Sequence, residues 1–124
     1  MAGLTFDTSA LIALERRRAR ISKIYTTAVA DGLRVTIPSV VVSEWWRSRT
    51  DARETILRGL IVEPVDTELA KLAGMAIATV RGATAIDALV MASAARRGDV
   101  VFTSDVGDLQ RLSAYFPAVR VLAV

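Results

Sequence analysis

The sequence predicts an α/β domain in which helices cover both faces of a parallel sheet. Short apolar segments rich in β-branched residues alternate with longer segments whose apolar residues recur at helical spacing. Apolar residues fill 52% of the 124 positions and charged residues 23%, a balance typical of one compact domain. Because strands that alternate with helices form parallel sheets, we expect residues 1–124 to form one domain of this class.

Five short apolar segments are expected to form the strands, and most are bounded by glycine, proline or aspartate: 3–6, 33–38, 60–65, 99–105 and 119–124. Pro64 cannot donate a ladder hydrogen bond, which places the third strand at an edge of the sheet. Pro38 closes the second strand and is expected to open the next helix.

The segments between these strands show helical patterns. Asp66 is the expected N-cap of one helix, with Glu68 in its first turn. The apolar stripe of this helix is expected in the core and comprises Leu69, Leu72, Met75 and Ala76. A later helix is almost wholly small and apolar, so it should be buried on most sides. The expected helical segments are 8–14, part of 15–32, 39–49, part of 48–58, 66–82, 84–98 and part of 105–116.

The chain contains neither cysteine nor histidine, and these absences exclude several kinds of chemistry. Without cysteine there is no disulfide, thiolate nucleophile or zinc–sulfur site. Without histidine there is no Ser-His-Asp triad, histidine general base or imidazole metal ligand. Any catalysis must therefore depend on carboxylates, basic side chains, hydroxyls or a bound cofactor.

The basic residues of the chain are almost all arginine. There are 16 basic and 13 acidic residues, for a net charge of +3, and only Lys23 and Lys71 are lysines. Arginine forms forked contacts with phosphate, so a polyanionic partner is one interpretation. The other is an ordinary solvated surface in which codon usage favours arginine. Charge alone does not decide between them.

The sequence shows no targeting or membrane segment. No basic region precedes an apolar core at the N-terminus, and no apolar run reaches the ~18 residues of a membrane span. We expect a cytoplasmic protein, or one also released from the cell, that does not contact a membrane.

Four acidic residues stand at equivalent places in the predicted fold. Asp7 and Asp105 follow the first and fourth strands, while Glu44 and Asp87 lie near the starts of later helices. Strand carboxyl ends and the helix N-termini that follow them share one edge of a parallel sheet. Ligands bind at that edge in folds of this type. We therefore expect the four carboxylates to converge in one cleft.

Helix capping is the alternative explanation for three of these acids. Asp7 directly precedes a helical segment, as an N-cap residue does. The segments 84–87 and 105–108 both have the spacing of a capping box. Taken one at a time, these acids are explained by capping at least as well as by a site.

Capping does not explain Glu44 or the environment of Asp87. Glu44 lies among bulky apolar neighbours, and Asp87 lies in a helix with almost no polar face, where an unpaired carboxylate is costly to bury. Carboxylates held together repel one another unless a cation neutralises them, and oxygen-only ligands favour Mg²⁺ or Mn²⁺. On this interpretation Asp7 is a metal ligand, and Thr8 or Ser9 caps the first helix.

These residues resemble the acidic motif of PIN-domain nucleases, and most closely that of the small toxins of bacterial VapBC toxin–antitoxin pairs. The resemblance spans essentially the whole chain and rests on 7–9 (Asp-Thr-Ser), Glu44, Asp87 and 103–105 with Asp108. It implies a PIN-like, Rossmann-like three-layer sandwich around a central parallel sheet of roughly five strands.

The resemblance also implies an endoribonuclease toxin that depends on Mg²⁺ or Mn²⁺. Water activated by the metal would cleave tRNA, rRNA or mRNA and leave 5′-phosphate and 3′-hydroxyl ends. The implied partners are a VapB-like antitoxin that inhibits the site and a second copy of the chain, in a homodimer or a heterotetramer or larger complex. The implied catalytic and metal-binding acids are Asp7, Glu44, Asp87 and Asp105, with Thr8, Ser104 and Asp108 in support.

Arginines lie close in sequence to the predicted site. Those after the first helix and those beyond Glu44 could contact RNA, although runs of charge are usually solvated surface. The candidates for RNA contact are Arg16, Arg17, Arg18, Arg47 and Arg49.

Two adjacent tryptophans follow Glu44. Trp45 and Trp46 cannot both face the core from one helix. We expect one to pack inside and the other to serve as an anchor for the antitoxin or a second copy.

Other classes of protein fit the sequence less well. A phosphoryl-accepting receiver needs paired acids at the first strand and a lysine after the last one, but only Asp7 is present and no lysine follows Lys71. A dehalogenase-type phosphatase needs a second acid where Ser9 stands. A non-catalytic nucleic-acid-binding or antitoxin-docking module remains as the alternative from another functional class.

Overall fold

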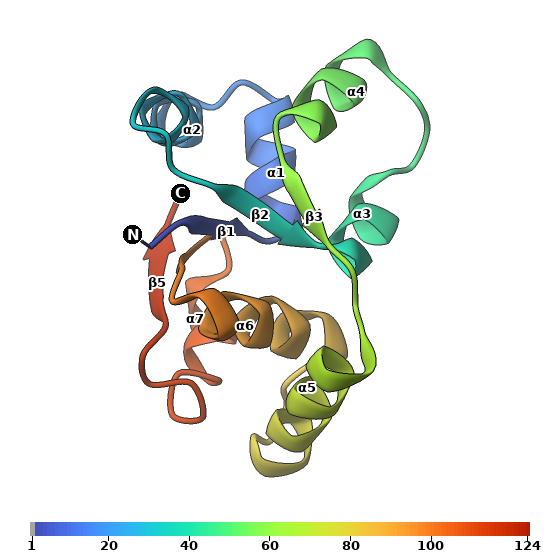
Figure 1. The fold of residues 1–124 in the computed structure, drawn as a ribbon, viewed down its shortest axis with the longest axis vertical. Helices are drawn as coiled ribbons and strands as arrows, with labels where there is room; N and C mark the ends of the chain where they lie inside the picture. Colours follow the sequence, from blue (N-terminus) through green and yellow to red (C-terminus); the bar gives the residue numbers. More distant parts are fainter. Residues whose placement is uncertain (1) are drawn as a thin grey trace.

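A computed structural model describes residues 2–124, in which five parallel strands form one sheet in the order β3-β2-β1-β4-β5 (Figure 1). This confirms the predicted fold class, and the strand that precedes Pro64 lies at an edge as expected. The strands are β1 (Leu4–Phe6), β2 (Val35–Pro38), β3 (Ile61–Glu63), β4 (Val100–Thr103) and β5 (Arg120–Ala123).

The strand order reverses between β1 and β4. Strand β1 pairs with β2 on one side and with β4 on the other, because the chain crosses the sheet before it enters β4. Phe6 of β1 lies opposite Phe102 of β4, so the carboxyl ends of these strands stand side by side. Open parallel sheets bind their ligands beyond the strand carboxyl ends at such a point.

Helices lie on both faces of the sheet. In Figure 1, α1, α2 and α4 lie on one face and α5, α6 and α7 on the other. Helix α3 contacts both α1 and α6. None of the helices in residues 2–124 is long and apolar enough to cross a membrane. The helices are α1 (Thr8–Glu15), α2 (Ala19–Ala30), α3 (Ser39–Trp45), α4 (Asp51–Arg58), α5 (Thr67–Thr79), α6 (Ala85–Arg97) and α7 (Val106–Gln110).

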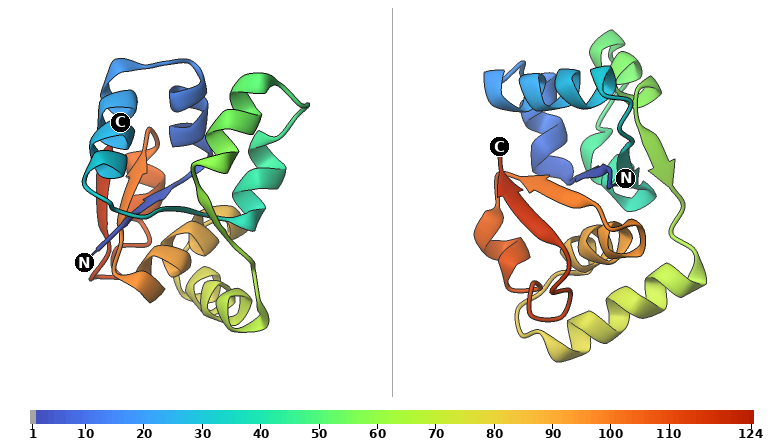
Figure 2. Two further views of the ribbon diagram at one scale, coloured as in Figure 1. Left: turned by 45° about the horizontal axis from the view of Figure 1, so that its top comes forward. Right: turned by 60° about the vertical axis from the view of Figure 1, so that its left-hand side comes forward.

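The small apolar helix α6 is buried on most sides, as its sequence predicts. It contacts β1, β2 and β4, and its buried residues run from Ala88 to Ala94 with few interruptions. In both views of Figure 2, α5 lies beside α6 and away from the sheet. Asp66 caps α5 by accepting from the Leu69 N–H at 2.8 Å, and Gly98 ends α6 in the left-handed conformation.

Met75 of α5 is 62% exposed, so its predicted place in the core is wrong. Leu69 and Ala76 of the same stripe are fully buried, and Leu72 packs against the core from a partly buried position. Because α5 packs mainly against α6, only a narrow face of this helix can be buried. The apolar stripe in the sequence is wider than this buried face, and Met75 lies outside it.

Several expected elements are shorter than their sequence segments. Helix α3 ends at Trp45 because the backbone of Trp46 leaves the helical region, with a ψ of 86°. Helix α5 ends at Thr79, where Val80 turns extended. Pro38 belongs to β2 and the next helix begins at Ser39. An apolar residue, Trp46 or Val80, directly follows the last helical residue of α3 and α5, so the apolar pattern alone does not show where these helices end.

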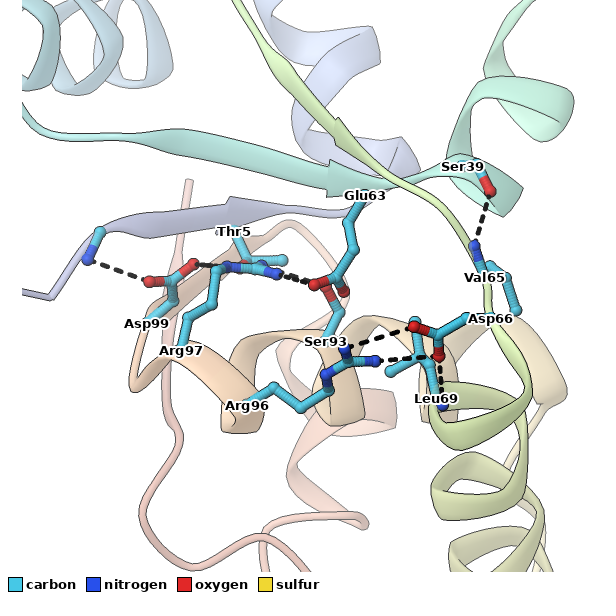
Figure 3. A network of polar contacts seen from close by, with 11 residues as sticks. Thr5, Ser39, Glu63, Val65, Asp66, Leu69, Ser93, Arg96, Arg97 and Asp99 are labelled. Carbon is cyan, nitrogen blue, oxygen red and sulfur yellow. Dashed lines mark hydrogen bonds and ion pairs between the residues drawn. The ribbon is translucent and has the colours of Figure 1, made fainter.

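A buried polar network ties the sheet to the end of α6 (Figure 3). Arg97 donates to Asp99 at 2.9 Å, to Glu63 at 2.8 Å and to the Thr5 hydroxyl at 2.8 Å. Asp99 is only 3% exposed and also accepts from the Gly3 N–H at 3.0 Å. One guanidinium therefore joins β1, the end of β3 and the turn into β4, and it forms ion pairs with two carboxylates.

A candidate acidic active site

Asp7 leaves β1 at its carboxyl end and caps α1 directly. Its Oδ1 accepts from the Ala10 N–H at 2.9 Å and from the Ser9 hydroxyl at 2.7 Å, and its Oδ2 accepts from the Thr103 hydroxyl. The side chain is buried, with 5% of the residue exposed. The expectation that Thr8 or Ser9 caps α1 is therefore wrong, because Asp7 combines the cap with its place in the site.

The other three acids reach the same edge from α3, α6 and the β4–α7 turn. Glu44 of α3 accepts a hydrogen bond from the Thr8 hydroxyl. Asp87 lies in the first turn of α6, where its N–H donates to the Thr84 hydroxyl at 3.2 Å. Asp105 is exposed and its carboxylate does not cap α7. Capping thus accounts for Asp7 alone among the four carboxylates.

All four carboxylates line one pocket of about 330 Å³, which we call the acidic pocket. Asp7, Glu44, Asp87 and Asp105 share its lining with Thr8, Ser9, Thr84 and Ile86. The structure therefore brings together four residues that lie far apart in sequence. Their role as metal ligands stays a prediction.

The hydroxyl groups around Asp7 differ in part from those that the sequence suggested. Ser9 and Thr103 contact its carboxylate, whereas Ser104 contributes its backbone N–H, which donates to the Ser9 Oγ at 2.9 Å. Thr103 was missed because its contact requires β4 to lie beside β1. The alternation of side chains along β4, which turns Thr103 inward and leaves Ser104 exposed, was the available signal.

Asp108 lies outside the lining of the acidic pocket. It forms a loose ion pair with Arg111 at 3.9 Å, and both side chains are more than half exposed. Its negative charge still raises the pKa of Asp87, which places it near the site. Asp108 therefore acts on the site through its charge and does not line the acidic pocket.

The electrostatics of the acidic pocket disfavour full ionisation. Burial raises the pKa of Asp7, hydrogen bonds from Thr103, Ser9 and Ala10 oppose this shift, and the charge of Asp105 adds to it. Burial also raises the pKa of Asp87. The Thr84 hydroxyl opposes that shift, and negative charges that include Asp7 and Glu44 reinforce it. A bound cation would offset both the cost of burying these charges and the repulsion between them.

The donor set of the acidic pocket fits a hard divalent cation held by part of the site. No three carboxylates within residues 2–124 form a ready cluster around one point. Mg²⁺ does not require such a cage, because it keeps several waters and binds through one or two carboxylates together with substrate phosphate. Asp7 and Asp87, whose ionised forms are disfavoured, line one small pocket together with two further carboxylates and three hydroxyl residues, and this donor set meets the need.

A second pocket adjoins the acidic pocket, and we call it the arginine pocket. It has a volume of about 480 Å³ and shares Thr8, Ser9, Glu44 and Asp105 with the acidic pocket. The rest of its lining comprises Ile12, Glu15, Arg16, Trp45, Arg47 and Arg53. The two pockets together form a continuous surface of opposite charges.

The structure separates the five arginines that were candidates for RNA contact. Arg16 and Arg47 line the arginine pocket. Arg17 lines a different groove, beside Leu14, Tyr25 and Ile56. Arg49 pairs with Asp51 at 3.2 Å, and Arg18 precedes α2 at an exposed position, so neither lines the arginine pocket.

One of the two tryptophans packs in the core, as the sequence predicts. Trp45 is 2% exposed, and its Nε1 donates to Glu15 at 2.9 Å. Trp46 is partly buried and packs edge to face on Trp45, with ring centroids 5.9 Å apart. A partner role for Trp46 stays a prediction.

Comparison with known proteins places this geometry in a family. Residues 4–114 match the PIN domain model, which covers most of the chain. The chain belongs to the PIN domain family. No curated protein is similar enough in sequence to match this PIN domain.

Solved structures of similar fold support this assignment. A DNA-bound VapBC from Salmonella typhimurium matches with a TM-score of 0.78 at 20% identity, covering 99% of this chain and 98% of that one. VapBC2 from Rickettsia felis, bound to a promoter DNA fragment, matches with a TM-score of 0.79 at 12% identity over 98% of both chains. FitAB bound to the IR36 DNA fragment matches with a TM-score of 0.64 at 19% identity, covering 97% of this chain and 94% of that one. At these identities the matches establish the fold of this PIN domain.

Proposed function

We propose that this PIN domain is an endoribonuclease that depends on Mg²⁺ or Mn²⁺ and acts as the toxin of a toxin–antitoxin pair. The observation that carries the proposal is the acidic pocket, where Asp7, Glu44, Asp87 and Asp105 meet at the carboxyl edge of the sheet. With no histidine or cysteine in the chain, these carboxylates are the groups suited to support phosphodiester hydrolysis.

Asp7, Asp87 and Asp105 would be the metal-binding acids, one or two of them contacting the ion together with water and substrate phosphate, because no three carboxylates within residues 2–124 surround one point. Glu44 would hold a second metal or position the attacking water. When bound, the divalent cation supplies Lewis-acid stabilisation of the phosphate and lowers the pKa of a water molecule. The metal dependence and the RNA substrate both belong to this proposal.

The chain's own residues hold the carboxylates in place. Ser9, Thr103 and the Ala10 N–H fix both oxygens of Asp7, so this carboxylate needs no reorganisation when ligands arrive. The Thr8 hydroxyl orients Glu44 in the same way. Asp105 lines the acidic pocket from an exposed position, so its carboxylate is accessible to a cation or to the substrate.

The toxin role is supported by the proteins that share this fold. The similar structures from Salmonella typhimurium and Rickettsia felis are VapBC complexes bound to DNA, and the matches cover 99% and 98% of this chain. We propose a VapB-like antitoxin that inhibits the acidic pocket, together with a second copy of the chain in a homodimer or a larger assembly. Co-expression with the product of the adjacent upstream gene, followed by size-exclusion chromatography, tests this partner.

Cleavage of RNA by the purified chain tests the activity. With added Mn²⁺ or Mg²⁺ we expect products with 5′-phosphate and 3′-hydroxyl ends, and EDTA should abolish their formation. Asp87→Asn should remove cleavage. Asp51→Asn is the matched control, because Asp51 also lies in the first turn of a helix but is exposed and outside the acidic pocket.

Retained cleavage in EDTA or in Asp87→Asn would overturn the proposal. If no RNA is cut with either metal, while RNA or the antitoxin still binds, the non-catalytic module becomes the better description.

A further inference from the structure

The arginine pocket has a floor built from side chains that already neutralise one another. Glu15 accepts from the Trp45 Nε1 at 2.9 Å and forms an ion pair with Arg53 at 3.2 Å. Arg53 also donates to the Ser48 carbonyl at 2.8 Å. Glu15 and Arg53 are mostly buried, with 23% and 17% of their side chains exposed. The floor is therefore fixed in place and has no charge left to balance.

Arg16 and Arg47 stand on the same pocket with no such partner. Within residues 2–124, neither side chain makes an ion pair or a hydrogen bond, and both residues are exposed. They lie close to the site's carboxylates, because the pocket that they line also includes Glu44 and Asp105. Arg49 and Arg97 are held by acids, whereas Arg58 is exposed and also makes no ion pair within residues 2–124. Arg16 and Arg47 are therefore distinguished by their place beside the site's carboxylates. Two unpaired guanidinium groups beside an acidic pocket can hold an anion next to the reacting centre.

The pocket also has room and apolar surface for more than a phosphate. Its volume of about 480 Å³ is within the range of pockets that hold small organic ligands. Ile12, which lines it, is 37% exposed. Unstacked RNA bases commonly rest on apolar surface or on the plane of an arginine guanidinium.

We propose that the arginine pocket holds a nucleotide of single-stranded RNA that flanks the cleaved phosphodiester. Arg16 and Arg47 would contact its phosphates, and Ile12 and the plane of the Arg16 guanidinium would lie against its base. This assignment rests on the proposed function, since it takes the acidic pocket as the place of cleavage. It makes Arg16 and Ile12 determinants of which sequence is cut, and Arg47 a determinant of affinity.

Binding of a fluorescein-labelled single-stranded RNA, measured by anisotropy over a range of salt concentrations, tests the phosphate contacts. All chains carry Asp87→Asn, so that the RNA remains intact. We expect Arg16→Ala and Arg47→Ala each to weaken binding several-fold and to reduce the slope of log K against log salt concentration by about 0.7. Arg58→Ala is the matched control, because Arg58 is exposed and lines neither pocket.

Cleavage of an RNA pool with random flanking sequence tests the base contact. With Asp87 intact and Mn²⁺ present, we expect Arg16→Ala and Ile12→Ala to change the distribution of nucleotides beside the cut, while Arg58→Ala leaves it unchanged. Arg16→Lys should recover most of the salt slope but not the distribution, because lysine carries the charge without the planar guanidinium.

The outcomes separate this inference from the proposed function. If Arg16→Ala and Arg47→Ala behave as Arg58→Ala in both experiments, the assignment of the arginine pocket is overturned even when the chain cuts RNA. If the chain cuts no RNA but binding depends on Arg16 and Arg47, the pocket still holds RNA and the proposed nuclease activity fails.

Discussion

Two buried aspartates of this PIN domain lie in opposite electrostatic environments. Asp99, 3% exposed, receives a guanidinium from Arg97 in addition to a backbone N–H. Asp7, 5% exposed, receives hydroxyls and one N–H but no cation, and Asp105 adds a second negative charge nearby. The first aspartate is neutralised within the chain, whereas the second is fixed in position and left without charge compensation.

This difference indicates which carboxylates hold the fold together and which are available to a ligand. A buried charge is costly unless it is paired, so a group of buried carboxylates without cations is typical of a functional site. The Asp99 network joins elements of the sheet to α6 (Figure 3). The acidic pocket instead gathers unpaired carboxylates at the point where the strand order reverses. The following experiments test that contrast.

The largest effect is expected from a neutral substitution at each aspartate. Asp7→Asn keeps an oxygen to cap α1 and should leave the fold intact while cleavage falls at least about 1,000-fold, or roughly 4 kcal/mol in activation free energy. Asp99→Asn should lower stability and leave the kcat/KM of the folded fraction unchanged. Circular dichroism and cleavage rates on both variants measure the two effects. Equal losses of activity in the folded fractions would show that Asp7 is no more important for cleavage than Asp99.

The next effect is on stability and concerns Arg97. Arg97→Met should lower the free energy of unfolding by about 3 kcal/mol, because it leaves the carboxylates of Glu63 and Asp99 buried without a cation. Urea denaturation measures this change. Arg96→Met is the control, since Arg96 pairs with Asp66 at an exposed position, and it should change stability little. Similar losses in both variants would show that the buried ion pairs of Arg97 stabilise the fold no more than the exposed pair of Arg96.

Metal binding should stabilise the folded chain through the acidic pocket. At a Mn²⁺ concentration of ten times Kd, we expect the free energy of unfolding to rise by about 1.4 kcal/mol, and EDTA should reverse the change. A thermal melt with and without Mn²⁺ measures it. Asp87→Asn should show no such rise, while Asp51→Asn should retain it. A rise of equal size in both variants would place the ion elsewhere on the chain.

The smallest effect is the pH dependence caused by Asp87. Its pKa is raised above the ordinary value of 3.8 by burial and by neighbouring negative charges, so the ionised form costs stability. This cost is absent at low pH, grows as pH rises through the unfolded and then the folded pKa, and is complete at neutral pH. Asp87→Asn should therefore be more stable than Asp51→Asn by about 0.5–1 kcal/mol at pH 7.

The comparison is made with Asp51 because both aspartates lose the same favourable interaction with a helix N-terminus. Melting temperatures of both variants at pH 7 and at about pH 3 measure the difference, which should vanish at the lower pH. A difference that is unchanged between the two pH values would mean that Asp87 carries no electrostatic cost.

Local features of the fold were predictable because they depend on neighbours in sequence. Asp66 and Thr84 cap their helices by bonds to residues three positions ahead, and Gly98 ends α6 in a backbone conformation that suits glycine. The small side chains of α6 predicted its burial. The wrong prediction for Met75 has a different origin, because the part of α5 that is covered depends on how α5 meets α6.

The meeting of the four acids was also predictable from topology alone. Alternating strands and helices imply a parallel sheet, and a parallel sheet brings every strand's carboxyl end to one edge. This reasoning needs no knowledge of which strands are neighbours. It therefore predicts a common edge for Asp7, Glu44, Asp87 and Asp105, but it does not predict which side chains contact them.

The sequence by itself determined the order of elements, the caps of α5 and α6 and the presence of four acids at one edge. Only the tertiary structure decided that Thr103 contacts Asp7, that Arg97 neutralises Asp99, and that Arg16 and Arg47 line the pocket beside the site. The physical reason is the range of the interactions. A cap or a helical stripe is set within a few residues, whereas these contacts require strand neighbours and helix packing that the whole chain establishes together.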